Sequence, residues 1–540
     1  VPVLASRWLK AHEEEGQSRF ARAWERGFDR LAAAYRRLLA WALHHRPVVV
    51  AVATAALVVS LLPLHFNLIG QEYAPNEDDG QFTINTEMPP GTSLEETDRV
   101  LRHVEQLLRS TPEVESYSRR TGARLALAIA EPNTGDFLVR LKRERRRGLE
   151  EITSDLRTRI LASEPALEVE FPHILEDLVG DLAWSPQPIE IKLYGDDPGA
   201  YREAAERVAA WLPSVRGVVD VINQTIPIGP SLNIRVDPEK AARAGFRVPD
   251  VAALEAAMLD GSLATQMIRG ERLIGIRVRY PQQYRRTKAD LESLLLTSPS
   301  GQTVPLASIA QVEAEPATYE IRRENLRTLA AVTARLEGRD LGSAMAEIQR
   351  RLPKEVKLAP GIEVDYGGLY QLQKESFFGL TVVLLASVLL IFIILVAEFQ
   401  SYSHPTAILA ATLLCTSGSL LALFVTGETL NISSFMGVIM VVGIVHKNGI
   451  LMLDSEQEFS RRGFGLRDAI FHAGRRRLRP ILMTALATVF GMLPLALGVG
   501  SGAKMLQPLA IAVIGGVLVS MLLSLLVTPV LYGALRRRFE

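Results

Sequence analysis

The sequence predicts a membrane α-helical bundle of six transmembrane helices joined to an α+β water-exposed region made of split βαβ units. Hydrophobic residues form 48% of the 540 residues while charged residues form 22%, so the two kinds must be segregated along the chain. Six apolar stretches are long enough to cross a bilayer, and one strand-helix-strand pattern recurs between the first and second of them. A chain of this length also exceeds a single hydrophobic core, which favours separate membrane and soluble parts.

The six apolar stretches each approach the length of about 20 residues that a helix needs to cross roughly 30 Å of hydrocarbon. The second stretch contains no charged residue and gives the strongest signal. The predicted spans are residues 47–64, 377–397, 406–426, 432–453, 481–499 and 506–532.

The distribution of Lys and Arg orients these spans, because short loops rich in positive charge stay in the cytoplasm. Basic residues gather before the first span, between the fourth and fifth, and after the sixth, which is one side of the membrane if the chain crosses six times. The linkers 427–431 and 500–504 carry one basic residue between them and fall on the other side. We therefore expect residues 65–376 to form a periplasmic region, 377–535 a five-helix bundle and 536–540 a cytoplasmic tail.

Residues 1–46 are expected to hold the end of a preceding span and a cytoplasmic amphipathic helix. Large apolar residues recur there at helical spacing among charges, namely Phe20, Trp24, Phe28, Leu31 and Tyr35. In addition, Val1-Pro2-Val3-Leu4 resembles Thr528-Pro529-Val530-Leu531. This similarity predicts a chain that begins where one structural repeat ends and contains the whole of the next.

Within the periplasmic region, an alternating strand, an amphipathic helix and further strands recur three times. In the first unit, Ser93 is expected to cap a helix, with Glu96 three residues later. The three predicted units cover residues 81–141, 188–236 and 329–366. The segment at about 238–312 departs from the pattern, with an Ala-rich helix near 251–259 and a hairpin around Gly270, and is predicted to be an inserted subdomain.

Lys447 in the fourth span needs an explanation, because a lysine at membrane depth costs about 2.5–3.5 kcal/mol on insertion scales. Either its side chain reaches toward the cytoplasmic boundary, about eight residues away, or it faces a partner in a watery interior. Thr484 and Thr488 on the fifth span favour the second interpretation. No carboxylate lies deep in the predicted spans, so a functional Lys447 needs a partner from elsewhere. The neighbouring His446 is interpreted as a packing or interface residue.

Composition and missing motifs exclude several classes of protein. The 60 basic and 60 acidic residues leave a net charge of zero, so no overall field attracts nucleic acid. The single cysteine, Cys415, lies in an apolar stretch and can form neither an internal disulfide nor a cysteine-based metal site. No P-loop, HExxH, Cys-x-x-Cys or nucleophile elbow is present, which argues against an ATP-driven motor or a hydrolase; we expect no metal and no cofactor.

Over essentially its full length, the sequence resembles the C-terminal half of a resistance-nodulation-cell division (RND) efflux transporter permease of the acriflavine-resistance type. The resemblance rests on residues 443–451 (GIVHKNGIL) in the fourth span, residues 477–484 (RLRPILMT) entering the fifth, and residues 398–401 (EFQS) between the second and third. The order of one span, a large soluble region and five spans also matches. The family's porter subdomains are ferredoxin-like split βαβ units, and the insert at 238–312 resembles its docking subdomain.

This resemblance implies an inner-membrane pump driven by proton antiport rather than an enzyme. In drug-exporting members, a lysine and a threonine at the positions of Lys447 and Thr484 form a relay with two aspartates of the N-terminal half, and Arg477 matches a basic residue on the cytoplasmic side. Asn448, His446 and Thr488 are candidates for supporting roles. The implied partners are copies of itself in a homotrimer, the N-terminal half of the pump, a periplasmic adaptor (membrane fusion) protein, an outer-membrane channel and membrane lipids.

Small amphiphilic organic compounds are the substrate class that the sequence favours. Heavy-metal exporters of the family use methionine thioethers, and no methionine occurs here between Met88 and Met258. Metal-exporting relatives also tend to lack a lysine at the position of Lys447. Conversely, residues 122–126 lack the phenylalanines of drug-pump pockets, and residues 192–197 resemble metal exporters. Heavy-metal cation efflux, or a membrane-anchored module that translocates proteins or lipids, therefore stay open as alternatives.

Overall fold

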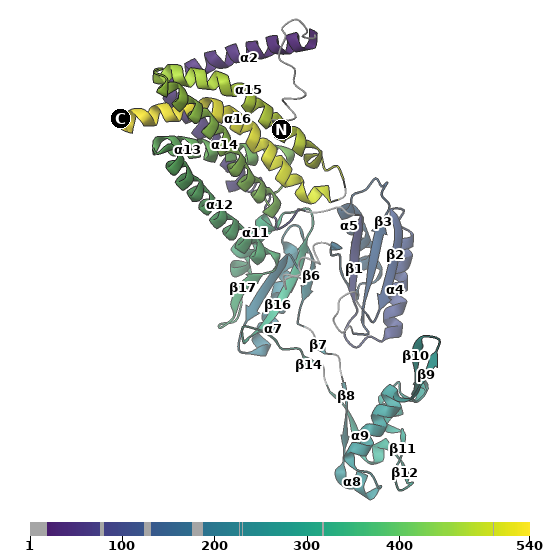
Figure 1. Ribbon diagram of the computed structural model, residues 1–540. Coiled ribbons are helices and arrows are strands. Elements are labelled where there is room, and N and C mark those ends of the chain that lie inside the picture. The colour runs from purple at the N-terminus through teal and green to yellow at the C-terminus, as the bar shows by residue number, and fades with distance from the viewer. Residues whose placement is uncertain are drawn as a thin grey trace.

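The computed structural model describes residues 19–75, 80–123, 131–174, 187–225, 227–228, 231–315, 318–500 and 502–539. The molecule is elongated, with a bundle of long helices at one end, two β-sheets beside one another next to it, and a third lobe at the far end (Figure 1). The segments 1–4 and 124–126, on which two of the comparisons above depend, lie outside the described residues.

Six helices of the described chain are long and apolar enough to cross a membrane, in agreement with the six predicted spans. They are α3 (Arg46–His65), α12 (Leu369–Phe399), α13 (Ser403–Thr426), α14 (Ile432–Arg461), α15 (Leu466–Ala496) and α16 (Ala503–Phe539). Local signals set several ends: Gly427 ends α13 in the left-handed region at φ 75°, and the Asn431 side chain accepts a hydrogen bond from the Ser434 backbone N–H to begin α14. Helices α14 and α15 both extend beyond the predicted spans.

The centre of the bundle is the crossing of α13 and α16, which approach closely through small residues. A Cβ added to Gly418 would lie 2.4 Å from the Gly515 carbonyl oxygen, and one added to Gly515 would lie 2.4 Å from that of Gly418. Both positions therefore require glycine, as is typical of close helix packing in membranes. Helices α13, α14 and α16 are about half buried or more, whereas α3, α12 and α15 are peripheral.

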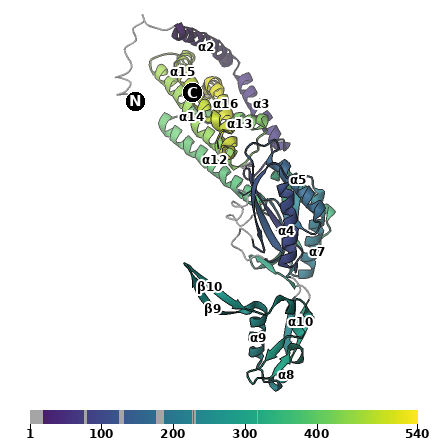
Figure 2. The same cartoon turned by 90° about the vertical axis from the view of Figure 1, so that its right-hand side faces the viewer.

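The amphipathic helix predicted before the first span is α2 (Arg19–His44), which lies at the end of the bundle away from the soluble lobes (Figure 2). The Tyr35 hydroxyl donates a hydrogen bond to the Leu525 carbonyl oxygen at 3.0 Å, and Leu39 is fully buried. Phe28 packs against the same cluster. The side chains of Phe20 and Trp24 lie outside the described residues.

The first sheet has the strand order β2-β3-β1-β4 and carries two helices. Its elements are β1 (Gln81–Glu87), α4 (Leu94–Arg109), β2 (Val114–Thr121), β3 (Thr134–Leu141), α5 (Leu149–Ser163) and β4 (Glu168–Glu170). The predicted cap is present, because the Ser93 hydroxyl accepts a hydrogen bond from the Glu96 backbone N–H at 3.3 Å. Helix α5 and strand β4 were not predicted from the sequence.

The second and third predicted units are not separate, because they form one sheet. Strand β16 pairs with β5 and β6, and β5 also pairs with β17. The elements are β5 (Ile189–Tyr194), α7 (Pro198–Trp211), β6 (Val218–Asn223), β15 (Arg322–Glu324), β16 (Arg327–Leu336), α11 (Leu341–Glu355) and β17 (Glu363–Gly367). Each predicted unit alone has too few strands to cover a core, so the two halves complete one another. The shared core includes Ile191, Val208, Val332 and Ile348.

The strand Ser231–Val236, predicted within the second unit, pairs instead with a strand of the far lobe. It is β8, and its partner is β13 (Ala310–Glu315). Between them lie α8 (Pro238–Arg243), α9 (Val248–Ala256), β9 (Ser262–Arg269), β10 (Arg272–Val278), α10 (Lys288–Glu292), β11 (Leu295–Thr297) and β12 (Thr303–Pro305). The short pair β7 (Pro227–Ile228) and β14 (Thr318–Tyr319) connects this lobe to the second sheet (Figure 1). The hairpin β9-β10 turns at Gly270, as predicted.

Candidate functional site

Lys447 lies near the middle of α14, roughly 21 Å of helix from either end. Its side chain is exposed and belongs to a helical stripe of uncovered positions, Met436, Met440, Gly443, Lys447 and Asp454. A Cβ added to Gly443 would meet nothing within 4 Å. Among the described residues, Lys447 takes part in no hydrogen bond or ion pair. The lysine therefore sits on an open surface of the bundle and not in its interior.

The two residues beside Lys447 point elsewhere on α14. Asn448 is buried, with 8% of its surface exposed. His446 is half-buried, and its Nδ1 lies 3.0 Å from the Val442 carbonyl oxygen of its own helix. Because successive residues are about 100° apart on a helix, the three side chains leave α14 in different directions.

The structure does not bring Thr484 into contact with Lys447. The Thr484 hydroxyl donates to the Ile481 carbonyl oxygen at 3.1 Å, and the Thr488 hydroxyl donates to the Thr484 carbonyl oxygen at 3.0 Å. Thr484 is exposed, as Lys447 is. Both residues therefore lie at the surface of the bundle.

Arg477 links α15 to the C-terminal part of α14. Its Nε donates to the Ser455 hydroxyl at 2.6 Å, and its Nη2 lies 3.8 Å from Asp454 Oδ2. Glu456, beside this pair, was not predicted from the sequence, because a carboxylate near the end of a span resembles a surface residue. Glu456 is 1% exposed, and its Oε1 lies 3.4 Å from Arg536 Nη1. A buried carboxylate therefore ties α14 to α16.

A cavity of about 360 Å³ lies where the two sheets meet the end of the bundle. The bundle contributes Leu369, Thr429 and Met505, so the cavity floor is at the level where the spanning helices end. Apolar side chains from both sheets and from the first linker also line it, including Phe171 and Tyr73. This cavity could not be predicted from the sequence, because its walls come from segments that are far apart in the chain.

The charges around the cavity are mixed, with an excess of carboxylates. Five carboxylates and three guanidinium groups line it, namely Glu72, Glu150, Asp220, Glu337 and Asp340 with Arg157, Arg335 and Arg339. Arg157 Nε donates to Asp220 Oδ1 at 2.6 Å and so joins α5 to β6. A cavity with apolar walls and a surplus of negative charge suits a ligand that is both apolar and cationic.

Comparison with known proteins places these features in a family. The profile of the AcrB/AcrD/AcrF family matches residues 1–536. The cobalt-zinc-cadmium resistance protein CzcA of Cupriavidus metallidurans is 30% identical over 535 residues, covering 95% of this chain and 50% of CzcA. The multidrug resistance protein MdtC of Yersinia pestis is 28% identical over 553 residues, covering 100% of this chain and 52% of MdtC.

The solved structures show the same likeness. A crystal structure of a heavy metal efflux pump superposes with a TM-score of 0.82 at 29% identity, covering 95% of this chain and 52% of that one. The chain thus spans about half the length of the relatives that it matches. Those relatives include proteins named for metal resistance and proteins named for multidrug resistance.

Proposed function

Because the chain belongs to the AcrB/AcrD/AcrF family of RND permeases, we propose that it is the C-terminal half of a proton-driven pump exporting small amphiphilic organic compounds. Permeases of this family are inner-membrane efflux transporters that work with an adaptor and an outer-membrane channel. We propose the same location and partners for this chain. It would act as a homotrimer, and its far lobe, about residues 238–312, would contact the outer-membrane channel. The two sheets would then be the periplasmic part that handles substrate.

The proposal rests on Lys447, whose side chain is exposed in the middle of a spanning helix. An ammonium group in the middle of a spanning helix is costly against lipid, by about 2.5–3.5 kcal/mol. The exposed stripe of α14 is therefore suited to contact another protein surface that carries carboxylates. The N-terminal half of the transporter would provide such a surface. In this proposal, Lys447 pairs with such a carboxylate and releases it when the carboxylate binds a proton, since the attraction ends when the charge is lost. Thr484 would complete the relay, and Arg477 would act at its cytoplasmic end.

The test is proton-coupled export by the complete pump in proteoliposomes. The Lys447→Ala variant is expected to lose substrate-dependent proton movement while the protein still inserts and assembles. Lys504→Ala is the matched control, because Lys504 is an exposed lysine at the start of α16. Unchanged proton coupling in Lys447→Ala would contradict the relay.

The acidic, partly apolar cavity supports an organic cation as the substrate. The competing candidate is a heavy-metal cation, which the named likeness to CzcA and to a solved heavy metal pump favours. Soft metal ions prefer sulfur ligands, and Met505 is the one sulfur-containing side chain among the described residues that line the cavity. We expect the complete pump to export an amphiphilic organic cation and to leave zinc, cobalt and cadmium gradients unchanged. Metal export without organic export would assign the chain to the second class.

A further inference from the structure

A strongly basic loop connects β3 to α5 in the first sheet. Residues 142–147 read Lys-Arg-Glu-Arg-Arg-Arg, which places five cations and one carboxylate in six consecutive positions. All except Arg145 and Arg147 are exposed. Such a run is often only a solvated surface, so its placement and its partners decide whether it has a role.

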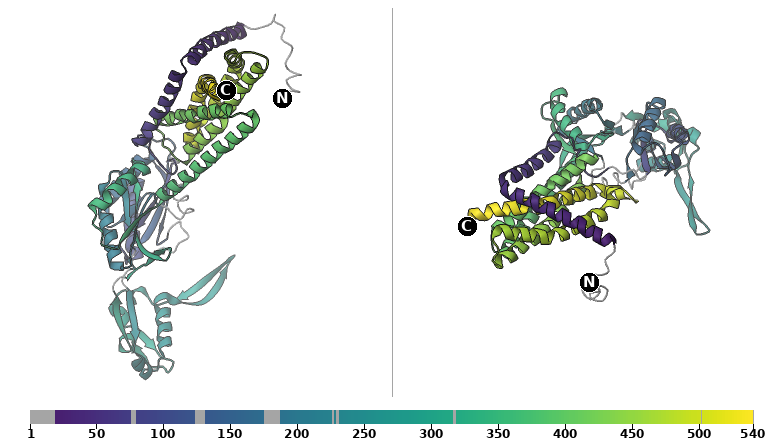
Figure 3. Two further views of the ribbon diagram at one scale, coloured as in Figure 1. Left: turned by 90° about the vertical axis from the view of Figure 1, so that its left-hand side faces the viewer. Right: turned by 90° about the horizontal axis from the view of Figure 1, so that it is seen from above.

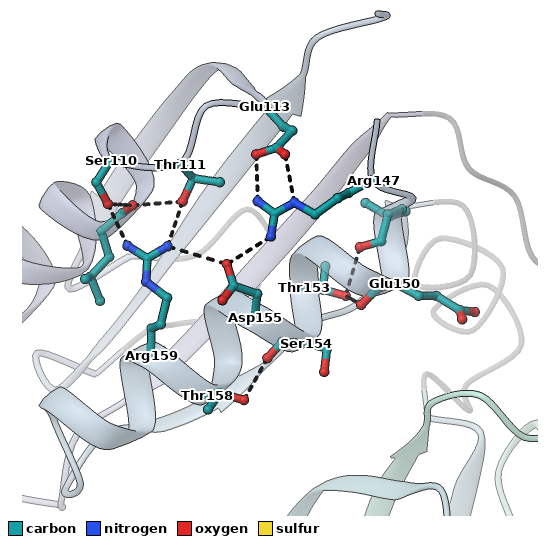
Figure 4. Close-up of polar contacts among 12 residues, drawn as sticks. Ser110, Thr111, Glu113, Arg147, Glu150, Thr153, Ser154, Asp155, Thr158 and Arg159 are labelled. Atoms are coloured by element: carbon teal, nitrogen blue, oxygen red, sulfur yellow. Dashed lines mark hydrogen bonds and ion pairs between the residues drawn. The ribbon is translucent and has the colours of Figure 1, made fainter. Parts of the chain in front are cut away.

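Contacts of Lys142 and Arg147 fix the conformation of this loop. Arg147 binds Glu113 through two hydrogen bonds of 2.7 Å each and lies 3.3 Å from Asp155, which also contacts Arg159 (Figure 4). Hydrogen bonding from Arg147 lowers the pKa of the Glu113 carboxyl, so this pair stays charged. The Lys142 ammonium donates to the Pro112 carbonyl oxygen at 2.6 Å. The loop is therefore anchored at both ends.

Two further cations of the loop have no partner among the described residues. Arg143 and Arg146 take part in no hydrogen bond or ion pair within the described part of the chain, and both are exposed. Glu113 and Asp155, which hold the loop, are engaged by Arg147 and Arg159, and Glu144 is the one carboxylate within the loop itself. The loop thus carries two exposed guanidinium groups that have no ion-pair partner among the described residues.

The loop lies at the level where the spanning helices end. Arg140, just before it, pairs with Gln81 at the start of β1, and the Leu141 N–H donates to the Gly80 carbonyl oxygen at 2.7 Å. Glu150, just after it, lines the cavity together with Met505 at the start of α16. In Figure 4 the Glu150 side chain extends away from the network of Arg147 and Asp155. The basic loop is thus at the end of the sheet nearest the bundle.

The helices run obliquely in Figure 1, and the first sheet lies beyond their right-hand ends, beside the second sheet. Figure 3 shows the same order of bundle, sheets and far lobe from another side. The basic loop, at the end of this sheet nearest the bundle, is therefore close to the helix ends, where a bilayer around the helices would have its surface.

We propose that Arg143 and Arg146, on the loop 142–147, bind the phosphate of anionic phospholipids in the outer leaflet. Guanidinium groups form paired, charge-assisted hydrogen bonds with phosphate, and basic groups close to an anionic membrane surface gain from its potential. The contact holds the first sheet, and with it one wall of the cavity, against the membrane. It requires neither proton coupling nor a particular substrate.

The test is lipid selectivity of the complete pump in nanodiscs that contain phosphatidylcholine with a minor fraction of phosphatidylglycerol. Native mass spectrometry after mild delipidation counts the lipids that stay bound. We expect wild-type protein to retain phosphatidylglycerol preferentially, and the Arg143→Gln/Arg146→Gln variant to lose about tenfold of that preference. Arg143→Lys/Arg146→Lys should keep most of it, which separates a loss of charge from a loss of folding.

The control is Arg269→Gln/Arg272→Gln, which makes the same charge change on exposed residues at the hairpin of the far lobe. It should retain phosphatidylglycerol as the wild type does. An equal loss in this control, or no loss in the Arg143→Gln/Arg146→Gln variant, would overturn the proposal. Competition by inorganic phosphate at millimolar concentration would also overturn it, because the loop would then be a general anion site.

Discussion

Arg335 Nε donates to Glu170 Oε1 over 2.7 Å, and this ion pair joins the two β-sheets while both side chains are almost completely buried. Arg335 belongs to β16 of the second sheet, and Glu170 ends β4 of the first. Arg157 makes a parallel connection from α5 to Asp220 in β6. Ion pairs therefore connect the two sheets, and separating the sheets would leave these buried charges without their partners.

Breaking this ion pair from one side should destabilise the soluble region strongly. Arg335→Met leaves the Glu170 carboxylate buried without its partner, which costs about 3–5 kcal/mol. Arg335→Met/Glu170→Leu should recover most of the loss, because no buried charge remains. Thermal unfolding of the purified protein measures both. A double variant as unstable as the single one would show that packing, and not charge, explains the effect.

The stability of the far lobe should depend on pH through Glu255. This carboxyl is 9% exposed and its Oε1 has no hydrogen-bond partner among the described residues, so burial raises its pKa from 4.5 to about 7. Between about pH 4.5 and pH 7, the folded state keeps a proton that the unfolded state releases. Stability therefore falls as the pH rises through this window.

Glu255→Gln should remove that dependence. We expect the variant to melt at a higher temperature than the wild type at pH 8 and at about the same temperature at pH 4. Glu271→Gln, an exposed site on the β9-β10 hairpin, is the control and should not alter the pH profile. Parallel pH profiles for the wild type and Glu255→Gln would exclude Glu255 as the group responsible.

The crossing of α13 and α16 should not tolerate side chains larger than glycine. Gly418→Val places new atoms where the Gly515 carbonyl already lies within 2.4 Å of an added Cβ, so the helices must separate. Gly379→Val on α12 is the matched control, because a Cβ there meets nothing within 4 Å. We expect Gly418→Val to lower yield and melting temperature, and Gly379→Val to resemble the wild type. Equal behaviour of the two variants would contradict the close crossing.

Helix α2 should loosen when Tyr35 loses its hydroxyl. Tyr35→Phe removes the hydrogen bond to the Leu525 carbonyl oxygen and leaves a buried acceptor unpaired, a loss of about 1–3 kcal/mol. Limited trypsin cleavage in α2, followed by mass spectrometry, should be faster in this variant. Tyr402→Phe, at an exposed position, should cleave at the wild-type rate. Unchanged cleavage in Tyr35→Phe would mean that packing alone holds the helix.

Much of this architecture follows from local pattern. The six spans were predictable because crossing a bilayer demands a continuous apolar length, which is a property of one segment at a time. The cap at Ser93 and the hairpin turn at Gly270 are likewise decided within a few residues. The amphipathic α2 follows from spacing alone.

Other features depend on segments far apart in the chain. The sequence predicted two separate units where β5 and β16 form one sheet, because strand pairing over more than 130 residues leaves no local trace. The bridges of Arg335 to Glu170 and of Arg157 to Asp220, and the cavity that they border, arise in the same way. Lys447 illustrates both cases. Its position in the middle of a span follows from the sequence, whereas its exposure depends on which helices pack around α14. Hydropathy is set residue by residue, whereas burial is set by the neighbours that folding brings together.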